Sequence, residues 1–319
     1  MSTKITDIII PEIHGRYVNK KALESNAFWT SGVVTDDAEL AQYLALGGAK
    51  VTLPFWQDLG EDEAVRSDSS DLPITKIEAG SQIAIKTFRD KAFGASNLAK
   101  ELAGADPLAA ILDKLAQWKA TQRQKRLIAT MNGIFAAASM STNIHDISAE
   151  IGADAVITPG SIVDAQGLLG DKQDELVAIA VHSATYTLLK KLQLITEVQP
   201  ATVGAAPIPY YGKYRVVVDD NLPVADGVYT SYLFAAGAVR FAAGGETVPM
   251  ETGRQKLTGG GTDYVVIREN SIIHVDGVSF VGAETLPTNA TLETGTKWSK
   301  VKAAKAIKVV AIKHRIAAA

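Results

Sequence analysis

Five histidines are the residues of this sequence best suited to acid–base chemistry or metal binding. They stand far apart, without the short spacings of metal ligands, at His14, His145, His182, His274 and His314. Cysteine is absent, which excludes disulfides, thiolate metal sites and cysteine nucleophiles. We therefore interpret each histidine as a surface group or a hydrogen-bonded core group, and we expect no cofactor, no metal and no catalytic residue.

The densest cluster of ionisable side chains lies between residues 57 and 73. Six carboxylates and one arginine give this segment a net charge of −5, from Asp58, Glu61, Asp62, Glu63, Asp68, Asp71 and Arg66. Carboxylates in this number could bind a cation or act as acid and base. Because no histidine partner and no EF-hand spacing accompanies them, we favour a hairpin loop that faces solvent or a partner.

Two shorter motifs have the residue types of a ligand site. Three glycines at 259–261 could approach a phosphate, but no Lys-Ser/Thr pair and no helix follows them. The run Asp219, Asp220 and Asn221 could hold a cation, yet it leads into Pro223 between two strand-like segments, which is typical of a turn. No nucleophile elbow, zincin motif or dinucleotide fingerprint occurs, so the sequence gives no support for an enzyme.

A long helical pattern from about residue 106 to 139 is the element around which the chain is organised. Asp106 is typical of an N-cap and Pro107 of a first helical turn. The apolar residues of its two halves lie on nearly opposite faces, which predicts two packing partners. Between them runs a basic stripe of Lys119, Arg123 and Arg126. A solvated patch on a core helix is the commoner explanation, and the alternative is a stripe that faces DNA or an acidic segment of a neighbour.

Around this helix the sequence predicts shorter elements. Residues 1–45 read as an extended arm that needs another surface to lie on. A strand at Lys50–Phe55 is followed by strands at 74–78 and 82–88 around a turn at 79–80. From about 153 to 270, strands, among them 153–158 and the apolar run at 175–182, alternate with helices, which is typical of a compact α/β arrangement.

Composition limits the class of protein. The chain has 319 residues, 47% hydrophobic and 21% charged, which is enough for a sizeable core and two domains. A net charge of −3 argues against a protein with a strong general affinity for nucleic acid. No apolar run approaches the length of a membrane span, so we expect no membrane partner.

Motifs along the whole chain share their order with one known family. They are Pro11-Glu12, residues 25–34, residues 51–59 with Pro54-Phe55-Trp56, residues 92–99, the long helix, 176–189, 211–223, 231–238 and 274–278. In this order they resemble the major capsid (coat) proteins of tailed bacteriophages, with the lambdoid-phage capsid fold. The run Tyr211–Pro223 is the most specific single match.

The resemblance implies an α+β fold with four named parts. An N-terminal arm would span 1–45 and an extended hairpin loop 46–93. A peripheral domain would comprise 94–157 and 273–319, with the long helix as its spine and a long sheet built from the segment after it and the last strands. An axial domain would span 158–272.

The resemblance also implies function and partners. The protein would be a non-enzymatic structural subunit that self-assembles, as hexamers and pentamers, into an icosahedral capsid shell enclosing phage double-stranded DNA. The virion capsid would be assembled in the host cytoplasm, with a portal protein and, as an option, a decoration protein. No long helical extension precedes the arm, so we expect a separate scaffolding protein; the alternatives are assembly without scaffolding and a scaffold cleaved from a precursor. Packaged DNA would be contacted non-specifically. The alternatives are an encapsulin-like compartment and, more remotely, an α/β hydrolase-type enzyme.

Inter-subunit contacts are expected from the hairpin and from the turn of the most specific match. The predicted interface residues are Pro54, Phe55, Trp56, Asp58, Glu61, Asp62, Glu63, Asp219, Asp220 and Asn221. The acidic segment would lie on basic residues of a neighbour, either the stripe Lys119 to Arg126 or the last segment of the chain. From Lys297 to the end that segment carries seven basic residues and no acidic one.

Overall fold

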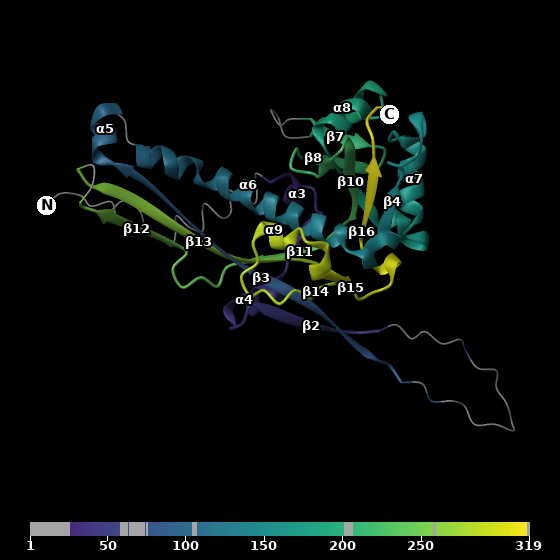
Figure 1. Ribbon diagram of the computed structural model, residues 1–319, viewed down its shortest axis with the longest axis horizontal. Coiled ribbons are helices and arrows are strands. Elements are labelled where there is room, and N and C mark those ends of the chain that lie inside the picture. Colours follow the sequence, from purple (N-terminus) through teal and green to yellow (C-terminus); the bar gives the residue numbers. More distant parts are fainter. Residues whose placement is uncertain are drawn as a thin grey trace.

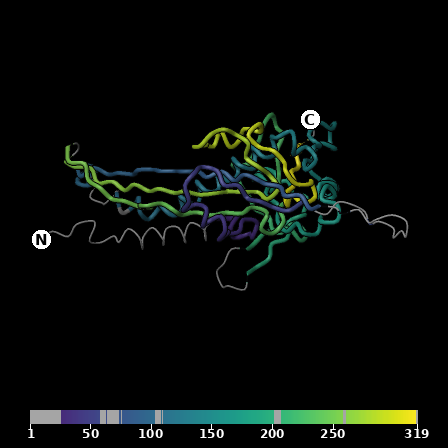
Figure 2. Tube along the Cα trace, turned by 90° about the horizontal axis from the view of Figure 1, so that it is seen from below, coloured from purple at the N-terminus to yellow at the C-terminus, as the bar shows by residue number. Residues whose placement is uncertain are grey.

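The computed structural model describes residues 26–57, 63, 74, 76–103, 107–200, 207–257 and 260–317. Figure 1 shows an elongated molecule in which a long wing, formed by a sheet and helix α6, continues into a compact lobe. Strands β2 and β3 extend from the wing as a hairpin, and Figure 2 shows the same elongation from below. Asp106, the expected N-cap of the long helix, lies outside the described residues.

The wing sheet contains six of the described strands, in the order β1-β11-β13-β3-β2 with β12 also paired to β13. Its centre is the long antiparallel pair of β3 and β13, whose register runs from Ser96 opposite Thr262 to Lys86 opposite Ile272. The strands are β1 (Val34–Asp36), β2 (Lys50–Trp56), β3 (Ala79–Ser96), β11 (Val239–Ala243), β12 (Met250–Gln255) and β13 (Thr262–Val275).

The lobe contains the second sheet, with described strands in the order β4-β16-β10-β5-β8-β7-β6 and β9 beside β10. Its central strand β5 is an almost continuous apolar run, which is typical of a strand covered on both faces. The strands are β4 (Ile144–Asp146), β5 (Leu176–Val181), β6 (Thr196–Val198), β7 (Ile208–Tyr211), β8 (Tyr214–Val218), β9 (Val224–Ala225), β10 (Val228–Ala235) and β16 (Val309–His314). Helices α7 (Pro159–Gly167) and α8 (Ser183–Lys191) belong to the same lobe.

Helix α6 (Pro107–Ala136) joins the two parts and confirms the prediction of two packing faces. Its first half packs on the wing, where Leu108 and Leu115 share a core cluster with Val265. Its second half belongs to the central core, where Ile134 and Phe135 lie among residues of β10, β11 and β14. The helix therefore fixes the wing to the lobe.

Shorter elements complete the fold. The remaining described helices and strands are α3 (Ala27–Thr30), α4 (Ala38–Ala45), α5 (Asn97–Ala103), α9 (Asn289–Leu292), β14 (Val278–Phe280) and β15 (Trp298–Lys300). Short 3-10 turns cover Ala138–Asn143, Gly152–Ala155, Gly170–Glu175, Gly295–Lys297 and Ala304–Ala306. Helix α9 lies against α6 at Gly133, where a Cβ atom would come within 1.8 Å of the Leu292 carbonyl oxygen.

Two local predictions are wrong. The expected turn at 79–80 lies inside β3, where Ala79 and Gly80 pair with Trp56 and Phe55. Gly80 fits the strand because the Phe55 ring occupies the space of its missing side chain. In place of the expected strand at 153–158, the chain forms a 3-10 turn at Gly152–Ala155 and a single isolated bridge between Val156 and Arg315.

The sheets also cross the predicted domain boundaries. Strands β11, β12 and most of β13 come from residues 158–272, yet they belong to the wing sheet, where β13 pairs with β3. Strand β16 comes from 273–319, yet it pairs with β10 in the lobe. The expectation that the long sheet is built from segments after α6 and the last strands is therefore wrong. Strand pairing joins distant segments, and local periodicity does not reveal it.

Candidate assembly surfaces and a buried charge cluster

The hairpin presents aromatic side chains in two different situations. Trp56 at the end of β2 is 68% exposed. Phe55 is partly buried, and the Lys302 Nζ atom lies 4.7 Å from its ring centre. Pro54 is exposed on β2, which is the edge strand of the wing sheet, where a missing amide proton is tolerated. Of Pro54, Phe55 and Trp56, the side chain of Trp56 is thus the one most available to a neighbouring molecule.

The acidic segment that follows β2 lies mostly outside the described residues. Asp58, Glu61 and Asp62 belong to that part, so their predicted contacts stay predictions. Glu63 is described and is exposed. Exposed apolar side chains flank the segment, since Ile77 is 47% exposed near the start of β3.

Further exposed apolar groups lie at the opposite end of the wing. Leu98 and Leu102 on α5 are 53% and 80% exposed. Leu257, just after β12, is 94% exposed. Figure 1 places α5 and β12 together at this end of the wing, far from the hairpin. Both ends of the long molecule therefore carry apolar surface that the described part of its own chain does not cover.

The predicted interface residues 219–221 form the expected turn, but they differ in exposure. Asp219 is buried and bonded within its own subunit, accepting hydrogen bonds from Gln124 of α6 and from the backbone N–H of Asn221. Asp220 is exposed, and hydrogen bonds from the side chain and the backbone N–H of Ser183 lower the pKa of its carboxyl group. Of these three residues, only Asp220 and Asn221 remain accessible to a neighbour. The described residues contain no group of side chains that could hold a metal ion, at this turn or elsewhere.

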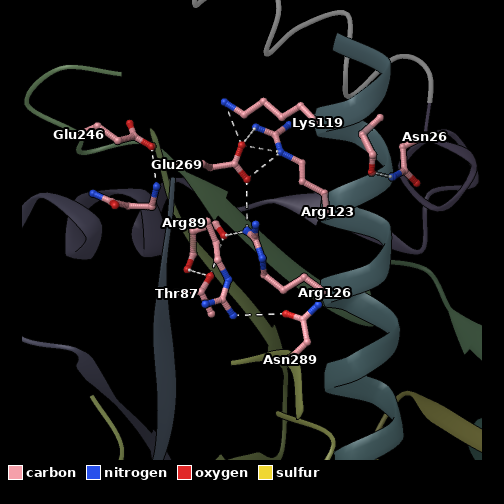
Figure 3. A network of polar contacts seen from close by, with 12 residues as sticks. Asn26, Thr87, Arg89, Lys119, Arg123, Arg126, Glu246, Glu269 and Asn289 are labelled. Carbon is pink, nitrogen blue, oxygen red and sulfur yellow. Dashed lines mark hydrogen bonds and ion pairs between the residues drawn. The ribbon is translucent and has the colours of Figure 1, made fainter. Parts of the chain in front are cut away.

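The basic stripe on α6 is buried, contrary to the expectation of an open surface. Figure 3 shows Lys119, Arg123 and Arg126 turned toward Glu269 of β13. Lys119 Nζ lies 3.0 Å from Oε2, Arg123 donates from Nε at 3.1 Å and from Nη2 at 2.9 Å, and Arg126 Nη1 lies 3.3 Å from Oε1. The stripe therefore takes its acidic partner from the same subunit, and its contact with DNA or with a neighbour stays a prediction.

Glu269 is the centre of this cluster. Burial alone would raise the pKa of its carboxyl group, but Arg123, Lys119 and Arg126 together lower that pKa to about 2. The carboxylate stays ionised and links α6 to the wing sheet. Sequence reasoning missed it, although one signal was present. Val265, Ile267 and Glu269 alternate along β13, which places this one acid on the buried face.

Two histidines are also buried. His314 on β16 lies 2.9 Å from the Ser231 hydroxyl through its Nε2 atom, which confirms a hydrogen-bonded core histidine. Neither ring nitrogen of His274 on β13 has a hydrogen-bond partner in the described part of the chain, so that expectation is wrong for His274. Burial lowers the pKa of each imidazole to about 4, and both rings are neutral at pH 7.

Comparison with solved structures defines the fold class. The chain is similar to the capsid protein of Ralstonia phage GP4, with a TM-score of 0.60, 10% identity, and 90% and 87% of the two chains covered. It is also similar to the capsid of cyanophage Pam1, with a TM-score of 0.56, 11% identity, and 89% and 88% covered. The fold is therefore that of tailed-phage major capsid proteins, as expected from the motifs.

Sequence comparison gives the family. The Gp13-like family, described as Major capsid protein 13-like, matches residues 54–311, and the chain belongs to it. It is 38% identical to the major capsid protein of Bacillus phage SPP1 over 326 residues, covering 99% of both chains. The protein is a non-enzymatic structural subunit of the phage head shell and resides in the virion capsid. In the described part of the chain, no helix has the length and apolar character needed to cross a membrane.

Proposed function

We propose that the hairpin of β2 and β3 is the main element through which one subunit binds the next in the shell. The observation that carries this proposal is Trp56, a large aromatic side chain that is 68% exposed at the end of a hairpin leaving the core. An exposed indole is costly in a monomer and is a common energetic anchor in interfaces. We keep as a proposal the four parts implied by the resemblance, namely an arm at 1–45, a hairpin loop at 46–93, a peripheral domain at 94–157 and 273–319, and an axial domain at 158–272, although the two sheets cross these boundaries.

For the acidic segment 57–73, a second copy of this protein offers a surface of opposite charge. The residues from Lys297 onward are basic, but several of them already have acidic partners within the subunit. Lys297 pairs with Glu284, and Lys302 pairs with Asp276. Lys308 is exposed, and no ion pair joins it to the described residues. We assign to the acidic segment of a neighbour the basic surface formed by Lys308 and by Lys305, whose Nζ atom lies 3.4 Å from Asp171 Oδ1 in an exposed ion pair.

The wider set of partners follows from the same proposal. Subunits would join as hexamers and pentamers, with a portal protein at one vertex, a separate scaffolding protein during assembly and a decoration protein as an optional outer partner. Packaged DNA would be contacted non-specifically. Asp220 and Asn221, exposed on the lobe, would contribute to contacts between subunits.

The test of the hairpin is the variant Trp56→Ala. Because the exposed indole contributes little to the subunit's own core, the free energy of unfolding should stay within about 0.5 kcal/mol of the wild type. The yield of shells, measured by sedimentation and electron microscopy, should fall several-fold. Leu192→Ala, at a site 49% exposed on the lobe, is the matched control and should assemble normally. Normal assembly of Trp56→Ala would contradict the proposal.

A further inference from the structure

A cavity of about 350 Å³ lies between α6, β3 and β13, beside the Glu269 cluster. Trp118, Gln122, Ile267 and Asn289 supply part of its lining. The remaining lining is charged and consists of Arg89, Asp90, Lys91, Lys119, Arg126, Arg268 and Glu269. The cavity thus gathers five basic and two acidic side chains from three elements far apart in sequence.

The positive charge of this cavity is not balanced by its own carboxylates. Arg268 can be set aside, because it pairs with Glu251 at 3.1 Å. Four cations and two carboxylates then remain, and four minus two leaves an excess of two positive charges. Glu269 is moreover shared, since Arg123 binds it from outside the cavity. Unbalanced charge in a partly buried site is unfavourable, and a bound anion would relieve it.

Arg89 is the cation of this cavity whose charge is least compensated. Its Nη2 atom donates to the Pro287 carbonyl oxygen at 2.6 Å and to Asn289 Oδ1 at 3.3 Å, so the guanidinium is held in place by neutral groups. No carboxylate of the described residues forms an ion pair with it. Figure 3 shows Arg89 and Arg126 between β3 and α6. Burial lowers the pKa of both groups, and the charge of Arg89 lowers that of Arg126 further.

We propose that this cavity is a binding site for a dianionic oxyanion of the phosphate class, held by Arg89, Lys119 and Arg126. Guanidinium groups present parallel N–H donors that match the oxygens of a phosphate, and an ammonium adds a compact charge. A dianion neutralises the excess of two charges, which a single carboxylate does not. The volume is at the lower end of small-ligand pockets and suits phosphate or pyrophosphate. The site does not depend on how subunits contact one another.

The experiment measures anion-dependent stability of the purified full-length subunit. Phosphate and pyrophosphate at about ten times their dissociation constants should raise the melting temperature by about 2 °C or more over sodium chloride of matched ionic strength. Calorimetric titration with pyrophosphate should give a dissociation constant at least about tenfold weaker for Arg89→Gln. Arg254→Gln is the matched control, because Arg254 is an exposed arginine of the same sheet that pairs with Asp263. It should bind pyrophosphate like the wild type.

Further arms identify the source of the phosphate group. An Arg89-dependent shift with a short DNA duplex would support the proposal with the DNA backbone as the source, and a shift with inorganic phosphate alone would support it with a free ion. Equal shifts in wild type and Arg89→Gln would overturn it, because the effect would then be a general salt effect. Absence of any shift would also overturn it. If the melting temperature rose in an Arg89-dependent way only with a peptide of residues 57–73, the proposal would also be overturned, because the ligand would then be the carboxylates of a neighbour and not a phosphate.

Discussion

At the scale of single residues, Gly133 shows how a helix position can be fixed by its neighbours and not by helix propensity. A Cβ atom there would lie 1.8 Å from the Leu292 carbonyl oxygen and 2.6 Å from Trp298 Nε1. These two atoms already form a hydrogen bond with each other, at 2.7 Å. The missing side chain therefore allows α9 and β15 to lie directly on α6.

Gly133→Ala should consequently destabilise the subunit, although alanine is the better helix former by about 1 kcal/mol. A 1.8 Å overlap with backbone puts the cost of overpacking at the upper end of its usual range, about 2–3 kcal/mol, so the net loss in free energy of unfolding should be roughly 1–2 kcal/mol. Urea denaturation measures it. Gly167→Ala in α7, where a Cβ atom meets nothing within 4 Å, is the control and should be neutral or slightly stabilising. A stabilised Gly133→Ala would show that α9 moves freely.

Buried histidines predict a second residue-scale property, the pH dependence of stability. Folding lowers the pKa of His274 and His314 from about 6.5 to about 4, so the unfolded chain binds more protons between these values. The contribution of these histidines to the free energy of unfolding should therefore be fully present above about pH 6.5 and decrease as the pH falls toward 4. Each histidine contributes at most roughly 3 kcal/mol to this loss.

The variant His274→Leu separates the two contributions. Its ring nitrogens have no partner in the described part of the chain, so removing them breaks no hydrogen bond seen there. Urea denaturation of the unassembled subunit at pH 6.5 and 4.5 should show a pH-dependent loss smaller than that of the wild type by up to roughly 2 kcal/mol. Carboxyl groups begin to titrate near pH 4.5 in both proteins, so the difference between wild type and variant is the measure of His274. An unchanged loss would mean that His274 titrates normally in the folded protein.

At the scale of elements, the hairpin should serve assembly and not folding. Its strands β2 and β3 are paired from Lys50 to Trp56, and Val51 and Leu53 of β2 pack in a core cluster of described residues, so we expect the subunit to fold without the acidic segment. Deletion of residues 60–71 should leave the cooperative melting transition within a few degrees of the wild type, while shell formation falls sharply. Calorimetry and electron microscopy test the two statements separately. Loss of most of the transition would place the segment in the folding core.

Which elements could be predicted depends on the range of the interactions that form them. The apolar periodicity of α6 and the continuous apolar run of β5 are local, and both elements were predicted. The pairing of β3 with β13 joins residues about 180 positions apart and has no local signature. For the same reason, the basic stripe could be identified in the sequence, whereas the alternation along β13 marks Glu269 only as a buried acid and does not show that it pairs with the stripe. The exposed Trp56 follows from its place at a strand end, whereas the cavity beside Arg89 required the fold.

At the scale of the whole molecule, charge is distributed so that one copy complements another. The segment 57–73 has a net charge of −5, whereas the chain from Lys297 to its end has seven basic residues and no acidic one. Within the subunit, part of that basic charge is neutralised, for example by the pair of Lys313 with Asp146. Exposed pairs across an interface are worth only about 0–1 kcal/mol each. Repeated around every ring of the shell, such contacts still affect register and the rate of association.

Reversing the charge of Glu61, Asp62 and Glu63 to lysine should therefore slow assembly, and Lys305→Glu with Lys308→Glu in the same chain should partly restore it. Assembly of the wild type, followed by light scattering, should also slow with added salt, because the screening length falls from about 10 Å at 0.1 M to about 3 Å at 1 M. Reversal of three exposed lobe residues, Glu150, Asp154 and Asp164, changes the net charge equally and should have a smaller effect. Normal assembly of the first variant at low salt would show that the acidic segment meets no basic surface in the shell.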